Sequence, residues 1–365
     1  MRKLVVKFVF AAVLLSVMSG ISFGAVLIKA DPSQGVPELS FNGYQWLRYT
    51  AGYDNQKFIK SAFSVERTYI TTKVKADDYE AELTLDMPNT QYGQVVNNAA
   101  VPAQGAVDWA SWVKSAFVDF KTLPLLKEAD IRIRLGVQKS YFGTIDTWSY
   151  QLIDKAMEDT LKVADSANQG IALIGTIPFG FGDYQVAMYN GNGYKKIEDN
   201  LGKMLMGSIN VVPLVGISVR GSYAVNNIGE NRWTDGAPDT KLYQQTSRGA
   251  VVISLASGPI ESYFEGLEQQ TKKATGKSGI LQGFSGYLGV KIMDPLQICL
   301  RFDTINPDTE VERDEYNVYY AGVNYKIQEK VLLQVNYQLT QEKASNYQAK
   351  AVTNNLLMTQ VKWEY

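Results

Sequence analysis

From residue 38 onward the chain is a series of short runs in which every second residue is apolar or aromatic. Between Leu296 and Asp303, for example, apolar residues alternate with glutamine, cysteine, arginine and aspartate. A period of two places successive side chains on opposite faces of a strand, so each run predicts a strand with one apolar and one polar face. Sixteen strands are expected, at 38–50, 63–75, 79–87, 111–121, 130–139, 168–177, 183–190, 201–212, 215–226, 247–257, 260–269, 279–291, 296–305, 315–326, 330–341 and 353–365.

The connections between these runs alternate in length. Tight turns are expected at Asp77-Asp78, around Pro124, at Pro178-Phe179-Gly180, Pro213, Gly258-Pro259, Asp294-Pro295 and Gln328-Glu329. Longer polar connections are expected at 51–62, 88–110, 140–167, 191–200, 227–246, 270–278, 306–314 and 342–352. Outer-membrane barrels sort short turns and long loops to opposite ends in this way, and about 10 residues per tilted strand cross a bilayer. We therefore predict an all-β fold, a 16-stranded antiparallel transmembrane β-barrel.

The chain ends in a strictly alternating run, with Trp363 and Tyr365 on one side and Lys362 and Glu364 on the other. An open sheet edge in lipid would leave backbone amides unpaired, so the last strand is expected to pair with the first. Trp363 and Tyr365 would then lie in the aromatic band at the membrane boundary. The terminal run is therefore interpreted as the closing strand of the barrel.

The first residues predict export. Arg2, Lys3 and Lys7 precede or interrupt the apolar run Leu4 to Met18, and small residues follow it. This order is typical of a cleaved secretory signal peptide, here residues 1–24; a retained N-terminal anchor is the alternative. Residues 25–37 are expected to form a short periplasmic segment and residues 38–365 the barrel domain. Together, export and a barrel indicate the bacterial outer membrane, with its lipid and lipopolysaccharide as surroundings.

Composition excludes several functions. The chain has no histidine, which rules out serine-histidine or cysteine-histidine catalysis and histidine metal sites. Cys299 is the single cysteine, so no disulfide framework is possible within the chain. A formal net charge of −1 does not indicate a nucleic-acid partner. We expect no catalytic residue, no metal site and no cofactor.

Two stretches resemble a known family. Phe63-Ser-Val-Glu-Arg-Thr-Tyr-Ile-Thr-Thr-Lys73 resembles an early strand of the phosphate-selective porin O and P family, and Ile133-Arg-Leu-Gly-Val-Gln-Lys-Ser-Tyr-Phe-Gly143 resembles its Gly-x-x-Lys-x-x-Phe-Gly junction into the third loop. Most of the mature chain looks like the trimeric porins of Gram-negative outer membranes. The resemblance implies a channel, a homotrimer and a third loop folded into the barrel. It does not identify the solute, because the chain shows no clearly unopposed basic ladder.

Periodicity assigns basic side chains to the lumen. In strand 130–139 the residues Ile131 and Ile133 face lipid, so Arg132 and Arg134 face inward. A charge on the lipid face near mid-membrane costs ~2–4 kcal/mol, which favours this assignment. The same rule turns five further cations inward: Lys73, Lys75, Lys121, Arg220 and Arg301. Acidic residues share that face, namely Glu80, Glu82, Asp86, Asp119, Glu261, Glu265 and Asp303.

The longest connection, 140–167, is predominantly acidic and has helical spacing over 152–163. Its candidate constriction residues are Asp146, Asp154, Glu158 and Asp159. If this loop folds into the barrel, as the resemblance implies, its carboxylates would oppose the arginines of the adjoining strand. Opposed charges create a transverse field that favours small hydrophilic solutes. An exterior loop with solvated charges is the alternative.

These features predict an outer-membrane porin for passive diffusion of small hydrophilic solutes and ions. A non-channel barrel that serves as an adhesin or surface anchor is the alternative. A homotrimer is expected from the family likeness and from small residues such as Gly283, Gly286 and Gly289, which would allow close packing on the lipid face.

Overall fold

The computed structural model describes residues 25–31, 37–54, 57–87, 89–90, 108–109, 111–121, 130–196, 198, 202–228, 245–272, 278–312, 314–342 and 353–364. Its elements are β1 Ala25–Ile28, β2 Glu38–Asp54, β3 Lys57–Lys75, β4 Tyr79–Asp86, β5 Asn89–Thr90, β6 Asp108–Trp109, β7 Trp112–Phe120, β8 Ile131–Lys139, α3 Met157–Thr160, β9 Ala167–Ile177, η2 Pro178–Gly180, β10 Gly182–Tyr189, β11 Lys203–Leu214, β12 Ile217–Ile228, β13 Gln245–Ser257, β14 Ile260–Lys272, β15 Ser278–Met293, β16 Leu296–Asn306, β17 Tyr316–Gln328, β18 Val331–Glu342 and β19 Thr353–Glu364. Over the described ranges no helix is both long and apolar enough to cross a membrane.

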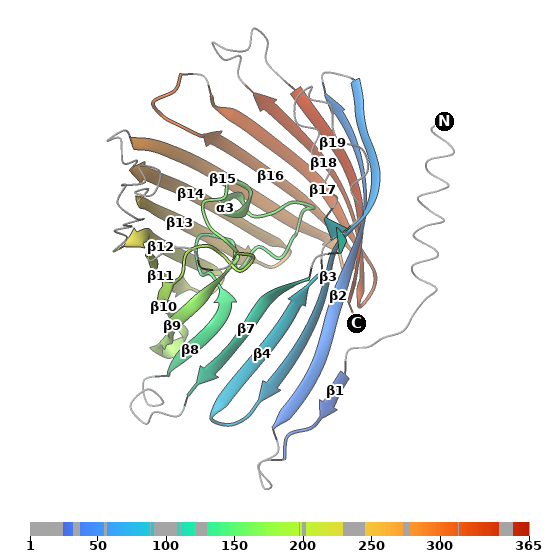
Figure 1. Ribbon diagram of the computed structural model, residues 1–365. Helices are drawn as coiled ribbons and strands as arrows, with labels where there is room; N and C mark the ends of the chain where they lie inside the picture. The colour runs from blue at the N-terminus through green and yellow to red at the C-terminus, as the bar shows by residue number, and fades with distance from the viewer. Residues whose placement is uncertain are drawn as a thin grey trace.

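Sixteen of the described strands, β2 to β4 and β7 to β19, form one closed antiparallel barrel (Figure 1). Each strand pairs with the next, and β19 closes the barrel by pairing with β2, with Trp363 opposite Gln45. The prediction that the final strand pairs with the first is confirmed. Strand β1 pairs with β2 at Phe41, just beyond the point where the pairing of β19 ends at Tyr44, so it prolongs that edge of the barrel.

Along the strands, alternate side chains lie in two different environments, the outer surface and the barrel interior. Outward residues such as Val186 of β10, Tyr223 of β12 and Phe264 of β14 are more than half exposed and belong to an apolar outer surface. Inward residues such as Gln185 and Ser222 are buried. An apolar outer wall around a polar interior is the arrangement that a bilayer requires of a barrel.

Some predicted boundaries are wrong. The long connection expected at 51–62 is mostly strand, because pairs such as Tyr53 with Phe58 continue the β2–β3 ladder to Asp54 and Lys57. The turn assigned to Pro213 lies at 215–216, and Pro213 itself falls inside β11 at a register shift, where no ladder hydrogen bond is needed from it. The expected turn around Pro124, the signal peptide 1–24 and Tyr365 lie outside the described residues.

Residues 140–166, between β8 and β9, lie inside the barrel (Figure 1). The predicted helix over 152–163 is reduced to the single turn of α3. The helix ends because Lys162 has a φ of 60° and the amides of Val163 and Ala164 both donate to the carbonyl of Glu158. Residues 140–166 as a whole are called the lumen loop below. Outside α3 the lumen loop has no regular structure. Its backbone groups therefore need partners from elsewhere.

Candidate functional site in the barrel lumen

The lumen loop packs on one part of the inner wall. Leu152 and Met157 are almost completely buried and face wall glycines. A Cβ atom at Gly283 of β15 would lie 2.9 Å from the sulfur of Met157, and one at Gly322 of β17 would lie 2.5 Å from Leu152 Cδ2. Glycine at these two wall positions therefore makes room for the loop, and the apolar contact holds the loop against β15 and β17.

Polar wall side chains bind the carbonyl oxygens of the loop. Arg301 of β16 donates to the carbonyl of Lys155 at 2.6 Å, and Asn324 of β17 donates to that of Gln151 at 2.7 Å. Further donors come from β12, β13 and β18: Arg220 to Gly143, Arg248 to Val163 and Gln334 to Tyr150. A loop without regular structure leaves its carbonyls unpaired, and these donors satisfy them. The loop is thereby attached to the strands from β12 to β18.

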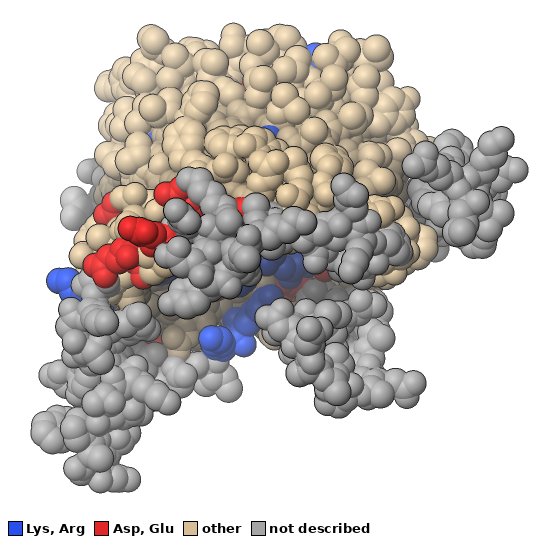
Figure 2. Space-filling view, turned by 90° about the horizontal axis from the view of Figure 1, so that it is seen from above, with Lys and Arg blue, Asp and Glu red and all other residues tan. Residues whose placement is uncertain are grey.

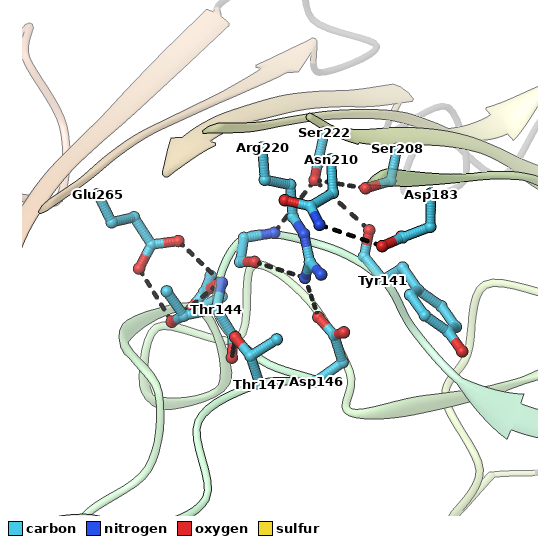
Figure 3. A network of polar contacts seen from close by, with 12 residues as sticks. Tyr141, Thr144, Asp146, Thr147, Asp183, Ser208, Asn210, Arg220, Ser222 and Glu265 are labelled. Carbon is cyan, nitrogen blue, oxygen red and sulfur yellow. Dashed lines mark hydrogen bonds and ion pairs between the residues drawn. The ribbon is translucent and has the colours of Figure 1, made fainter. Parts of the chain in front are cut away.

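One charged contact lies near the start of the loop, where Arg220 of β12 binds Asp146 (Figure 3). The same guanidinium donates to the carbonyl of Gly143 at 3.2 Å, and the amide of Gly143 donates to Ser222 Oγ at 3.3 Å. Burial raises the pKa of the Asp146 carboxyl above its ordinary value, and the neighbouring Arg220 opposes that change. Arg220 and Asp146, assigned from sequence to the pore wall and the constriction, thus contact each other between loop and wall.

A second contact joins two carboxyl groups. Glu158 of the loop and Glu265 of β14 are both fully buried, and both accept hydrogen bonds from Thr144. The hydroxyl of Thr144 lies 3.2 Å from one Glu158 oxygen and 3.1 Å from one Glu265 oxygen. Burial raises the pKa of Glu158, because no solvent stabilises its charged form. Two carboxyl groups this close favour a form that retains a proton, which can bridge them.

A third contact involves Asp154, whose carboxylate accepts a hydrogen bond from the hydroxyl of Tyr320 on β17. Beside it, Arg301 forms a two-point ion pair with Asp303 of its own strand, with N···O distances of 2.6 and 2.8 Å. The Arg301 guanidinium also lies over the ring of Trp148, 5.2 Å from its centroid. Arg301, which is buried, and Asp154 of the loop therefore hold the loop against this wall.

The other side of the loop is open. Two cavities lie between the loop and the walls formed by β2 to β4, β7 to β12 and β19, with volumes of about 590 and 350 Å³, and Asp146 lines both. The larger one is lined by residues near the short turns, including Asp77, Asp130 and Arg132. The smaller one is lined by side chains that include Lys73, Lys139 and Asp159. Seen from above, basic side chains gather near the middle of the molecule and an acidic group lies apart from them (Figure 2).

The basic residues predicted from strand 130–139 differ in environment. Arg134 is buried and forms a two-point ion pair with Asp119, at 2.6 and 2.7 Å. Arg132 lies 3.3 Å from the same carboxylate, but its side chain is 38% exposed and lines the larger cavity. The lumen loop is anchored on the far wall, so its carboxylates do not contact these two arginines in the described structure.

The predicted lysines lie on the open side. Lys73 pairs with Glu82 at 2.9 Å and lines the smaller cavity, and Lys121 pairs with Glu80 at 3.6 Å and lines the larger one. Lys75 is exposed at the end of β3. In the loop, Asp159 pairs with Lys155 at 3.7 Å and faces the smaller cavity.

Two lysines that line the smaller cavity, Lys114 and Lys139, were not predicted from the sequence. Lys114 should face lipid by strict alternation along β7, but the register shifts there: Ser115 pairs with Thr84 and Val113 with Leu85. This bulge leaves Lys114 unpaired in the ladder, and its side chain lines the smaller cavity. Lys139 lies at the last position of β8, where the chain leaves the wall, and it lines the same cavity.

The structure also shows where the lone cysteine lies and which way the glycines of β15 face. Cys299 is buried beneath the loop, 3.4 Å from both the Tyr287 hydroxyl and the Asn324 amide. Gly283 and Gly289 face inward and only Gly286 faces outward, beside Phe264, so the argument for a smooth outer face from these three glycines is wrong. Across the described residues no group of three or more His, Cys, Asp or Glu side chains is arranged to hold a metal ion.

Comparison with known proteins gives a likeness in structure alone. No family model and no curated protein matches this chain. Several solved structures, however, do match it. OmpT of Vibrio cholerae is 10% identical with a TM-score of 0.62, over 93% of this chain and 100% of the other. An anion-selective porin from Comamonas acidovorans is 12% identical with a TM-score of 0.63, over 90% and 100%. The outer membrane channel DcaP of Acinetobacter baumannii is 11% identical with a TM-score of 0.58, over 90% and 97%.

At identities this low the likeness establishes the fold and nothing more specific. The chain has the closed 16-stranded barrel that also forms outer-membrane porins. The fold class inferred from the sequence is confirmed.

Proposed function

We propose that this protein is an outer-membrane porin, a water-filled channel for passive diffusion of small hydrophilic solutes and ions. One observation carries the proposal. The lumen loop is attached to β12 to β18, and the two polar cavities on its other side meet at Asp146. A passage that runs past the loop through both cavities would have charged walls, as aqueous channels require.

In this proposal the predicted residues divide into two groups. Arg132, Lys73, Lys121 and Asp159 line the passage and act on solutes, and Lys75 lies exposed at the end of β3. Arg220 and Arg301, with Asp146, Asp154 and Glu158, hold the loop in position and so set the width of the constriction, whereas Arg134 pairs with Asp119 within the wall. The division rests on contacts, because the second group joins the loop to the wall through ion pairs and hydrogen bonds, whereas the first group makes no such contact between loop and wall over the described residues. Function then requires no cofactor and no chemical step, and a chain without histidine is consistent with that.

The apolar outer wall supports residence in outer-membrane lipid, with lipopolysaccharide around the loops. Within that wall, Trp363 and Tyr365 would anchor the closing strand at the membrane boundary. A homotrimer is proposed from the fold, and one structure of V. cholerae OmpT with this fold is described as a trimer form. The finer likeness to phosphate-selective porins O and P stays a hypothesis.

Planar-bilayer recording on purified protein tests the proposal. We expect stepwise conductance in potassium chloride and a cut-off for larger sugars. A folded protein that gives no conductance steps would contradict a channel and would favour the adhesin or surface anchor. Cross-linking in mild detergent tests the trimer separately, since a ladder that stops at the monomer would contradict it.

A further inference from the structure

The smaller cavity has an aromatic wall. Tyr44 and Trp46 of β2 stack with ring centroids 5.6 Å apart, and Tyr69 of β3 lies 4.7 Å from Tyr44. From the loop, Tyr150 meets Trp46 edge to face at 4.4 Å. All four rings line the cavity, so the passage is bordered by an aromatic surface built from two strands and the loop. This group is called the aromatic wall below.

Lysines surround the aromatic wall. Lys362 of β19 lies over the ring of Tyr44, 5.0 Å from its centroid, and pairs with Glu364 at 2.9 Å. Three others line the same cavity: Lys73, Lys114 and Lys139. They come from β3, β7 and β8, so cations approach the rings from several directions.

The carboxylates of the cavity do not cancel this charge. Each acidic group that lines it has a cation of its own: Glu82 has Lys73, Asp146 has Arg220 and Asp159 has Lys155. Lys114 and Lys139, by contrast, have no carboxylate oxygen within 4.0 Å among the described residues. The nitrogen of Lys114 instead donates to Ser166 and lies 4.4 Å from the ring of Tyr194. Because, within the described ranges, the carboxylates are paired and Lys139 is not, the cavity has an excess of positive charge next to aromatic rings.

We propose that this cavity is a subsite for a small aromatic carboxylate on its way through the pore. This inference rests on the proposed porin function and adds the class of solute. A planar ring gains contact with Tyr44 and its neighbours, while its carboxylate pairs with a cavity cation such as Lys139. An aliphatic acid uses the cations alone, and a neutral sugar uses the rings alone. The volume of about 350 Å³ is at the small end of the ~300–1,000 Å³ common for ligand pockets, which suits a single-ring solute.

Reversal potentials in planar bilayers test the subsite. Benzoate, cyclohexanecarboxylate and acetate have the same charge, and the first two have similar size but differ in aromaticity. We expect benzoate to exceed cyclohexanecarboxylate in permeability by about two- to tenfold, in the range of a single aromatic contact. Isothermal titration of detergent-solubilised protein with benzoate supplies a readout that does not depend on conductance. Saturable benzoate binding is expected, with weaker binding of acetate.

Two kinds of variant distinguish the contribution of the aromatic wall from that of the lysine charge. Tyr44→Phe is expected to keep the benzoate preference, and Tyr44→Ala to abolish it while chloride conductance persists. Lys139→Gln is expected to weaken benzoate and acetate alike, because both lose a cation. The matched control is Lys291→Gln, which removes an exposed cation at the β15–β16 turn, away from the cavity. If Tyr44→Ala fails to fold, Lys139→Gln and the wild-type comparison of the three acids still decide.

The outcomes are distinct. Chloride conductance without any preference for benzoate, and without saturable binding, overturns the subsite and leaves the porin intact. If the folded protein gives no conductance at all, the proposed porin function is contradicted. The benzoate titration is then the only measurement that tests the subsite. Equal effects of Lys139→Gln and Lys291→Gln on both readouts overturn the role of the cavity lysines.

Discussion

Arg220 on β12 and Asp146 in the lumen loop form an ion pair whose side chains are only 10% and 7% exposed. The pair joins a regular strand to a segment with almost no regular structure. A buried ion of this kind depends on its partner, because water cannot take the partner's place. The pair therefore decides where the start of the loop lies.

Arg220→Ala is expected to release this part of the loop. The substitution leaves the Asp146 carboxyl buried without its cation, and removing one partner of a buried pair costs about 3–5 kcal/mol. We expect a lower unfolding temperature and larger, noisier conductance steps. Asp146→Asn should have a smaller effect, since its amide oxygen still accepts from Arg220. The control, Lys291→Ala, breaks an exposed ion pair with Asp294 and should change neither property. Unchanged conductance in Arg220→Ala would show that the pair does not position the loop.

The Glu158 and Glu265 carboxyls predict a dependence on pH. The pKa of Glu158 is raised in the folded protein above its ordinary value of 4.5. Its protonated form is therefore favoured by folding, and the stability it contributes is greatest below that ordinary value and falls as pH rises through the raised pKa. Heat-induced unfolding of the wild type should thus occur at lower temperature as pH increases over this window.

Glu265→Gln tests the same contact. An amide keeps a hydrogen-bonding group beside Glu158 and Thr144 but removes the second acidic group. We expect unfolding at neutral pH to shift to higher temperature, by the equivalent of about 1–3 kcal/mol, with a shallower pH dependence than in the wild type. The measurement is the temperature of the gel-mobility change on heating, at pH 5 and pH 8. A variant as pH-sensitive as the wild type would contradict the contact.

Cys299 is a natural reporter of the loop, because it is the single cysteine of the chain and lies buried beneath it. A maleimide reagent is expected to leave the folded wild type unmodified and to label the heat-unfolded protein completely. Leu152→Ala removes a fully buried side chain that covers this region and costs about 2–5 kcal/mol. It should make Cys299 reactive without unfolding the barrel. Rapid labelling of the folded wild type would show that the loop does not cover this wall.

Arg132 and Arg134 are expected to respond differently to substitution. Arg132→Ala removes an exposed cation from the larger cavity and should move the reversal potential in a salt gradient toward cation selectivity. Arg134→Ala instead leaves Asp119 with one weaker partner in a buried position, so its main effect should be on stability. Equal shifts of reversal potential in the two variants would contradict this assignment.

The residue pattern determined the barrel. Alternation is a local property of a strand, and the residues of tight turns such as Gly258 and Pro259 act over a few positions, so both can be read without knowing what lies opposite. Closure followed as well, because an open edge of the sheet would leave backbone amides without partners in lipid. The strand ends were less accurate near Asp54, where pairing across the hairpin extends the strands past polar residues.

Only the tertiary structure decided what the inward side chains do. Periodicity assigns Arg220, Arg301 and Arg132 to the same face, yet the lumen loop binds the first two, whereas the third pairs with a wall carboxylate and its side chain stays 38% exposed. A bulge reversed the side of Lys114, which no local pattern reports. The physical reason is that alternation defines a direction for each side chain, whereas burial and charge pairing depend on which distant segment packs against it.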